Sequence, residues 1–317
     1  EVFKILMSYP SYFNPKNSLN LFGLQKDFRF LKDLYTNDKL PKVLMLSGNK
    51  GVGKSTLINH FLYSIFESDN YDIQNNKCMS SSAFLKQFQN NIFSNILFIN
   101  GADFKSVKVD DIRNLKSRIF QSSMLDKDRF IILDDVELFN ANSLNSLLKI
   151  IEEPSKRNYF FLINNKSKPI LETVKSRTLE IKIILNEKKR LEIIDNLIKT
   201  FDLEISLEPK ASNLSPGIFI KFNHICKKND ILPTNDYIEN LSLILNLFRK
   251  EKDILFIHLA FFISDLYFDN LKQKNIIEID KIFEIKNYIF DNLNNFHLYN
   301  INKNSLLNAV STKLNYE

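Results

Sequence analysis

The positions of the few glycines constrain the fold of this chain more than any other feature of its sequence. Only 6 of the 317 residues are glycine, and three of them, Gly48, Gly51 and Gly53, fall within one six-residue window. Glycine reaches left-handed backbone conformations and allows close backbone approach, so this cluster predicts a tight loop. The run Val43–Leu46 before it is wholly apolar and reads as a buried strand, whereas a helical pattern begins at Lys54. The chain is therefore expected to pass from a strand to a helix through this loop.

Residues 48–55 read Gly-Asn-Lys-Gly-Val-Gly-Lys-Ser and match the phosphate-loop pattern G-x-x-x-x-G-K-[S/T] in the strand–loop–helix setting that it requires. The backbone N–H groups of such a loop surround phosphates, and the N-terminus of the following helix adds positive potential. Lys54 is expected to reach the β- and γ-phosphates, and the Ser55 hydroxyl to ligate Mg²⁺. The alternatives are a glycine turn without a ligand, and a loop that binds nucleotide tightly but never hydrolyses it. The residues of this predicted site for ATP or ADP with Mg²⁺ are Gly48, Asn49, Lys50, Gly51, Val52, Gly53, Lys54, Ser55 and Thr56.

Two acids follow a second apolar run. Asp134 and Asp135 come directly after Phe130–Leu133. In ATPases with this loop, the first acid at such a strand end holds the Mg²⁺ shell, so Asp134 is the candidate partner of Ser55. The next position usually carries a glutamate that orients the attacking water, and Asp135 is about one methylene shorter. A misplacement of about 1 Å can slow a reaction a hundredfold, so we predict weak or absent hydrolysis. The alternative is that both acids only cap the turn.

The first half of the chain alternates apolar runs with helical patterns, which predicts an α/β fold. Four of the runs are unbroken and suit strands buried on both faces of a parallel sheet, whereas the fifth alternates and is expected near the edge. The expected strands are Val43–Leu46, Ile96–Ile99, Phe130–Leu133, Tyr159–Ile163 and Leu179–Ile184. The expected helices lie near Lys54–Phe66, Asp110–Phe120 and Asn142–Ile151.

After about Ile184 the pattern is helical. An amphipathic helix is expected over Asn186–Phe201, and Pro216-Gly217 is expected to interrupt a second helical stretch. From about Leu232 onward the chain is apolar-rich and helical. We therefore expect a nucleotide-binding core over residues 1–185, a helical lid over 186–230 and an all-helical domain over 231–317. Residues 69–82 are polar and low in complexity, and a surface excursion is expected there.

Composition excludes several classes of site. Forty-three basic and 37 acidic residues give a net charge of +6, which does not establish nucleic-acid binding. Two cysteines, Cys78 and Cys226, cannot form a four-cysteine zinc site or a disulfide framework. No zinc is therefore expected, and a cytoplasmic location is the default. The most apolar stretch, Ile254–Phe268, carries His258 and Asp265, so a buried helix is expected rather than a membrane span.

Four further segments resemble one family when they are taken in order. Residues 134–142 read Asp-Asp-Val-Glu-Leu-Phe-Asn-Ala-Asn and residues 146–154 read Ser-Leu-Leu-Lys-Ile-Ile-Glu-Glu-Pro. Phe-Phe-Leu-Ile-Asn-Asn follows at 160–165 and Val-Lys-Ser-Arg-Thr at 174–178. Over about residues 19–220 this series resembles the AAA+ ATPase core of DNA clamp-loader subunits. Segments 21–23, 109–113 and 215–217 resemble, respectively, the family's opening to the adenine pocket, the segment before its Mg²⁺ strand, and its lid motif.

The resemblance implies a fold, roles and partners. It implies an α/β AAA+ core with a parallel sheet, then a small helical lid and an all-α collar through which subunits form a ring. Ser176-Arg177-Thr178 matches the family's Ser-Arg-Cys motif, so Arg177 is implied to act in trans as an arginine finger in a neighbour's ATP site. Asn165 occupies the polar sensor position beside the γ-phosphate. The implied partners are the motor ATPase and delta subunits, with the sliding clamp and primed DNA reached through the complex.

Two departures from the family pattern refine this interpretation. Only Cys78 stands where members often carry a four-cysteine zinc module, and no arginine after Gly217 is placed to act as a lid sensor. The missing lid arginine and the shorter Asp135, beside an intact phosphate loop, favour a stator that holds nucleotide over a motor. For single residues, the alternatives are an ordinary surface arginine at Arg177 and a strand-ending asparagine at Asn165.

Two other functions compete with this interpretation. A self-sufficient AAA+ ATPase, either a loader motor subunit or a helicase-type remodeller, would hydrolyse ATP as an isolated chain. A small-molecule kinase would use the same phosphate loop, but it leaves the Ser-Arg-Thr element and the helical tail unexplained. The resemblance favours the clamp-loader subunit.

Overall fold

The computed structural model describes residues 9–80, 82–101, 114, 117, 119, 127–152, 157–274 and 278–314. These residues form two compact units. The first comprises Pro10–Phe201 and Ser215–Ile218, and the second comprises Tyr9, Asp202–Leu214 and the chain from Phe219 onward. This division does not separate a lid from a collar, so the three domains expected from the sequence stay a prediction.

A five-stranded parallel sheet forms the centre of the first unit, in the order β4-β5-β6-β1-β7. Every residue of β1 and β6 is buried, as the unbroken apolar runs predict for inner strands. The alternating strand β7 lies at the edge and is mostly exposed, again as predicted. The predicted α/β class is therefore confirmed. The strands are β1 (Val43–Ser47), β4 (Ile96–Asn100), β5 (Arg129–Asp134), β6 (Asn158–Asn164) and β7 (Leu179–Lys182).

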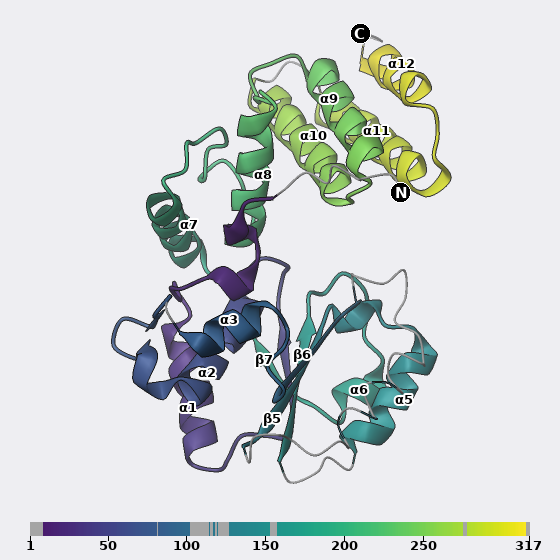
Figure 1. The fold of residues 1–317 in the computed structure, drawn as a ribbon. Helices are drawn as coiled ribbons and strands as arrows, with labels where there is room; N and C mark the ends of the chain where they lie inside the picture. The colour runs from purple at the N-terminus through teal and green to yellow at the C-terminus, as the bar shows by residue number, and fades with distance from the viewer. Residues whose placement is uncertain are drawn as a thin grey trace, which may run out of the picture. The chain divides into compact units, whose positions relative to one another are not determined.

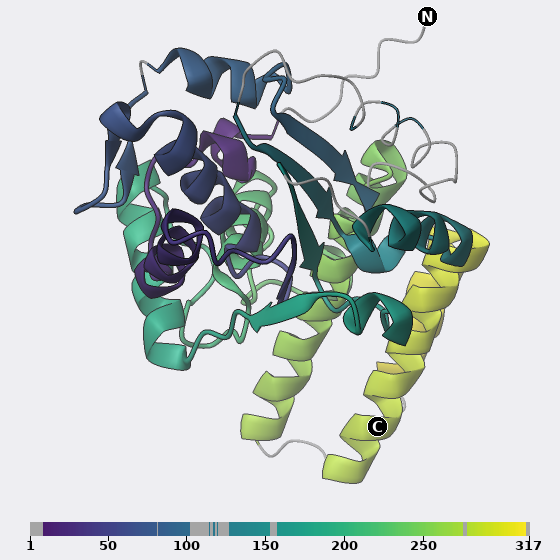
Figure 2. The ribbon, with the colours of Figure 1, turned by 90° about the horizontal axis from the view of Figure 1, so that it is seen from below.

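Helices cover both faces of this sheet (Figure 1). On one face lie α1 (Gln25–Thr36), α2 (Lys54–Phe66) and α3 (Ala83–Gln89), and on the other lie α5 (Ala141–Ile151) and α6 (Glu172–Lys175). The view from below shows the same layers (Figure 2). Successive side chains of a strand point to opposite faces, so β5 contributes to both cores. Its Phe130 and Ile132 pack in the core beneath α2, whereas Ile131 and Leu133 pack beneath α5.

The parallel arrangement brings the predicted site residues together at the carboxyl ends of the strands. Loops that follow parallel strands all lie at this end of the sheet, where α/β proteins bind ligands. The glycine loop follows β1, the two acids stand at the end of β5, and Asn165 directly follows β6. Since β1, β6 and β5 are neighbours in the sheet, these three segments lie side by side.

Three segments differ from what the sequence predicts. The helix α1 was not predicted, although its buried Phe28 and Leu31 have helical spacing. Within residues 69–82, the hairpin of β2 (Tyr71–Asp72) and β3 (Lys77–Cys78) buries Tyr71 and Cys78, so this segment is not only a surface excursion. Pro216 begins helix α8 (Pro216–Lys228) rather than interrupting a helix, because the first helical position needs no N–H donor. Of the helix expected over residues 110–120, only residues 114, 117 and 119 lie within the described chain.

Helices dominate the remaining described chain, as the sequence predicts. The first unit also contains α7 (Glu187–Phe201) and the short 3₁₀ turns η1 (Ser11–Phe13), η2 (Pro15–Asn17), η3 (Ser68–Asn70) and η5 (Val136–Leu138). Besides most of α8, the second unit contains α9 (Tyr237–Glu251), α10 (Leu255–Gln273), α11 (Ile279–Tyr299) and α12 (Lys303–Leu314). Among the described residues, no helix has the length and apolar character needed to cross a membrane.

Candidate nucleotide-binding site

The loop between β1 and α2 has the backbone geometry that its glycines predict. Gly51 and Gly53 have φ angles of +85° and +100°, in the left-handed region that residues with a side chain rarely adopt. Gly53 directly precedes α2, whose first N–H groups lack helical partners and so form an anion-binding end. Leu24, next to the predicted adenine segment, lies beside this turn: a Cβ atom on Gly53 would stand 3.0 Å from its Cδ1.

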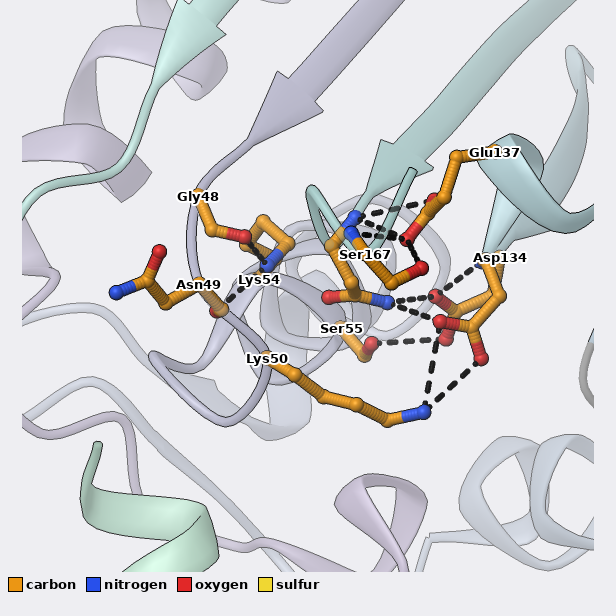
Figure 3. A network of polar contacts seen from close by, with 10 residues as sticks. Gly48, Asn49, Lys50, Lys54, Ser55, Asp134, Glu137 and Ser167 are labelled. Carbon is orange, nitrogen blue, oxygen red and sulfur yellow. Dashed lines mark hydrogen bonds and ion pairs between the residues drawn. The ribbon is translucent and has the colours of Figure 1, made fainter. Parts of the chain in front are cut away.

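Lys54 is folded inward onto the loop (Figure 3). Its ammonium donates hydrogen bonds to the carbonyl oxygens of Gly48 and Asn49, at 2.5 and 2.9 Å. The residue is only 3% exposed, and this burial lowers the pKa of Lys54 to about 8, an effect that the charge of Asp134 partly opposes. The loop therefore keeps a buried cation at the position where the motif predicts the β- and γ-phosphates.

Ser55 and Asp134 form the pair predicted for a metal ion. The Ser55 hydroxyl donates to Asp134 Oδ2 at 3.1 Å. Burial, and then the neighbouring charge of Asp135, raise the pKa of Asp134, so a cation beside it would offset both effects. Hydroxyl and carboxylate oxygens are ligands that Mg²⁺ accepts, and the residues present therefore fit this ion. Across the described chain, no three His, Cys, Asp or Glu side chains gather as a metal site, so phosphates and water would have to complete the ion's shell.

Asp135 is held by two side chains from different segments. The residue is 4% exposed and adopts the left-handed conformation, with φ of +49°. Its Oδ1 accepts a hydrogen bond from Asn165 Nδ2 at 2.6 Å, and its Oδ2 lies 3.3 Å from Lys50 Nζ in an ion pair. The amide of Asn165 also lies 3.4 Å from Asp134 Oδ1. The structure thus brings the predicted sensor residue and both predicted acids together.

Glu137 belongs to this group, although the sequence analysis did not single it out. It lies in η5 and is 5% exposed. Its carboxylate accepts the backbone N–H of Asn165 at 3.1 Å and the hydroxyl of Ser167 at 2.8 Å. The signal available in the sequence was an acid between Val136 and Leu138, in a stretch otherwise suited to burial.

The predicted lid motif contacts the outer side of the glycine loop. Ser215 donates its hydroxyl hydrogen to the carbonyl oxygen of Lys50 at 2.5 Å, and the N–H of Gly217 donates to the carbonyl oxygen of Gly51 at 2.9 Å. The backbones approach so closely that a Cβ atom on Gly217 would stand 3.0 Å from that same oxygen. The absence of a side chain at Gly217 thus lets the two backbones meet directly.

Arg177 lies on the surface rather than in this group. It stands between α6 and β7, and its side chain is 38% exposed. Its Nε pairs with Glu152 at 2.6 Å, and its Nη1 donates to the carbonyl oxygen of Thr173 at 3.0 Å. Its partner Glu152, which follows helix α5, is itself exposed.

A family model described as "DNA polymerase III, delta subunit" matches residues 23–186 of this chain. The match spans the glycine loop, both acids, Asn165 and Arg177. A DNA polymerase III subunit gamma from Buchnera aphidicola is 24% identical over 187 residues, which are 58% of this chain and 50% of that protein. A DNA polymerase III subunit delta′ from the same species is 26% identical over 140 residues, which are 43% of this chain and 42% of that protein. The chain thus spans about half the length, or less, of these two curated relatives.

The fold also matches a solved structure. The crystal structure of a DNA polymerase III gamma subunit-related protein from Thermotoga maritima aligns with a TM-score of 0.50 and 16% identity. The alignment covers 90% of this chain and 98% of that one. At this identity the match concerns the fold alone, and it agrees with the AAA+ architecture predicted from the sequence motifs.

Proposed function

The chain belongs to the DNA polymerase III delta-prime/gamma clamp-loader family, with the AAA+ fold, and from this premise we propose that it works as the delta-prime subunit of the loader. In this role it helps to place the sliding clamp on primed DNA, together with the motor ATPase and delta subunits. The observation that carries the proposal is the family match over residues 23–186, which includes the Ser-Arg-Thr element.

The proposed subunit binds ATP or ADP with Mg²⁺. The backbone of residues 48–53 and the ammonium of Lys54 would hold the phosphates, with Thr56 in the first turn of the following helix. Ser55 and Asp134 would hold Mg²⁺, which neutralises phosphate charge when it is bound. The buried cation of Lys54 and the 3.1 Å contact of Ser55 with Asp134 support this assignment.

The proposed subunit hydrolyses its own nucleotide weakly or not at all. Asp135 is short for a water-orienting acid, and Asn165 and Lys50 both engage its carboxylate. Asn165 is proposed as the polar sensor, because its amide lies within 3.4 Å of Asp134 and 2.6 Å of Asp135. A side chain in this position is close to where the γ-phosphate would sit.

Arg177 is proposed to complete the ATP site of a neighbouring subunit. Its exposure supports action outside its own chain, and the pair with Glu152 keeps the guanidinium ordered until a partner binds. An arginine that meets developing charge on a transferred phosphoryl group accelerates transfer by about 10³–10⁵-fold. The helical residues from 231 onward are proposed as the collar of the assembly, and 186–230 as the lid.

A self-sufficient ATPase is the second candidate. An intact phosphate loop and a paired Ser55 and Asp134 favour it, and gamma subunits stand among the relatives beside delta′ subunits. The isolated chain would then turn over ATP, and Lys54→Ala would abolish that turnover. Asp135 and the absence of a lid arginine after Gly217 weigh against it.

The deciding experiment measures ATP turnover by the whole loader, reconstituted with its motor and delta subunits, clamp and primed DNA. Replacement of Arg177 by alanine is expected to abolish turnover at one neighbouring site, while Lys175→Ala, an exposed neighbour, leaves it unchanged. Undiminished turnover with Arg177→Ala would remove the role in trans. Turnover by the isolated native chain at the rate of the whole loader would favour the self-sufficient ATPase.

A further inference from the structure

Lys50 is the other lysine of residues 48–55, and its side chain contacts a different group from that of Lys54. Lys54 turns inward to the carbonyl oxygens of Gly48 and Asn49. Lys50 extends across the site to Asp135, with its Nζ 3.3 Å from Oδ2 and 3.5 Å from Oδ1 (Figure 3). The loop therefore supplies one cation to the phosphate position and another to the acid at the hydrolytic position.

Segment 215–217 holds the backbone of the loop at Lys50 and Gly51. Its carbonyl oxygen accepts the Ser215 hydroxyl at 2.5 Å, and the next residue, Gly51, accepts the Gly217 N–H at 2.9 Å. A side chain rooted in an anchored backbone loses less conformational freedom when it forms an ion pair. These contacts therefore favour the reach of Lys50 toward Asp135.

Asp135 has little freedom to leave this pair. The carboxylate is 4% exposed, so it has lost most of its water and depends on protein partners. Asn165 and Lys50 bind one carboxylate oxygen each at their shortest contacts. A water-orienting carboxylate must turn a lone pair toward the water, and the contacts with Asn165 and Lys50 compete with that orientation.

We propose that Lys50 is a positioning residue that restrains Asp135 and so keeps bound ATP from being hydrolysed. The inference rests on the nucleotide-binding part of the proposed function. It attributes the weak hydrolysis of ATP to the contact between Lys50 and Asp135, in addition to the short side chain of Asp135. In hydrolysis, the oxygen of a water molecule bonds to the γ-phosphorus while the bond from this phosphorus to the β–γ bridging oxygen breaks. ADP leaves with that electron pair, and one proton of the water passes to a base. By pairing with the Asp135 carboxylate, Lys50 keeps Asp135 from acting as that base.

The test is single-turnover hydrolysis at saturating ATP and Mg²⁺ by the isolated full chain, with ATP binding measured in parallel. Lys50→Met removes the charge and is expected to speed hydrolysis about two- to fivefold, as release of a half-exposed ion pair permits. Lys50→Arg keeps the charge and is expected to retain the native rate. Lys199→Met, on an exposed part of α7, controls for loss of a lysine elsewhere.

A double variant separates restraint of the acid from general loosening of the loop. If Lys50→Met acts by freeing Asp135, adding Asp135→Asn returns the rate to the native value or below. A gain that survives in the double variant overturns the inference, and so does Lys50→Met hydrolysis no faster than the native chain while the native chain binds ATP. If the native chain binds no ATP, the nucleotide part of the proposed function fails, and the role of Lys50 falls with it.

Discussion

The carboxylate of Glu137 fixes the backbone of Asn165: its two oxygens lie 3.1 and 3.2 Å from the backbone nitrogen of Asn165. Glu137 follows β5 and Asn165 follows β6, so this contact ties together the ends of two neighbouring strands. The Asn165 side chain in turn donates to Asp135 at 2.6 Å. A buried acid thus positions the side-chain amide that contacts the hydrolytic acid.

Glu137→Gln is expected to destabilise the chain by about 1–3 kcal/mol and to weaken ATP binding. The carboxylate accepts hydrogen bonds from two backbone N–H groups and one hydroxyl, of Asn165 and Ser167. A carboxamide replaces one acceptor by an NH₂ group that faces these donors, which leaves buried groups unsatisfied. Urea unfolding and equilibrium ATP binding measure the two effects. Glu192→Gln, on an exposed part of α7, is the matched control and should change the free energy of unfolding by less than about 0.5 kcal/mol.

The sheet and the glycine loop were predictable because each has a local signal. Unbroken apolar runs mark strands buried on both faces, and the alternation in 179–184 marks the edge strand. The order β4-β5-β6-β1-β7 and the contacts across it have no such signal. Glu137 is an example: its role comes from a hydrogen bond with Asn165, which is 28 residues away in the chain, and no local pattern predicts that contact.

The errors have similar physical causes. Helix α1 begins without a side-chain cap, so the usual start signal is missing at Leu24. The short hairpin around Tyr71 and Cys78 is polar in sequence, yet Tyr71 packs on Phe28 of the unpredicted helix. Proline breaks a helix interior but suits the first helical position, and the turn before Pro216, which the local sequence does not specify, decides between the two. Each error concerns a segment whose structure is decided by its neighbours.

ATP binding is expected to weaken about tenfold between pH 7 and pH 9 through Lys54. Burial lowers the pKa of Lys54 to about 8, so the charged fraction falls from about nine-tenths to one-tenth across this interval. Phosphate binding requires the charged form, and affinity follows this fraction. Equilibrium titration with ATP and Mg²⁺ at each pH measures the change. Lys54→Arg stays charged throughout, so its affinity should be flat over the same interval; a native profile as flat as this one would contradict the prediction.

His60 is expected to make the fold sensitive to mild acid. Burial lowers the pKa of His60 to about 4, and its ring contacts the Tyr71 hydroxyl at 3.0 Å and the Ser18 carbonyl oxygen at 3.1 Å. Between about pH 6.5 and pH 4 the unfolded chain binds a proton that the folded chain excludes, so stability is lost as the pH falls through this window. The expected loss is about 2 kcal/mol between pH 7.5 and pH 5, from urea unfolding. His60→Gln lowers stability at both values but cannot titrate, so its loss over this interval should be smaller by that amount. Equal losses in the two proteins would remove His60 as the cause.

Gly51→Ala is expected to be more damaging than Gly217→Ala, although the two glycines meet at the same contact. Gly51 has φ of +85°, and a Cβ atom there would stand 2.9 Å from the backbone nitrogen of Ile218. Backbone strain and the clash together cost about 2–3 kcal/mol. At Gly217 the added Cβ atom would stand 3.0 Å from the Gly51 carbonyl oxygen, but alanine favours the helix that begins there, so the net cost is about 1 kcal/mol. Urea unfolding measures the loss of unfolding free energy in each variant, and ATP affinity shows whether the glycine loop keeps its conformation. If Gly217→Ala proved the more damaging, the contact would be governed by the turn before α8 rather than by the conformation of the glycine loop.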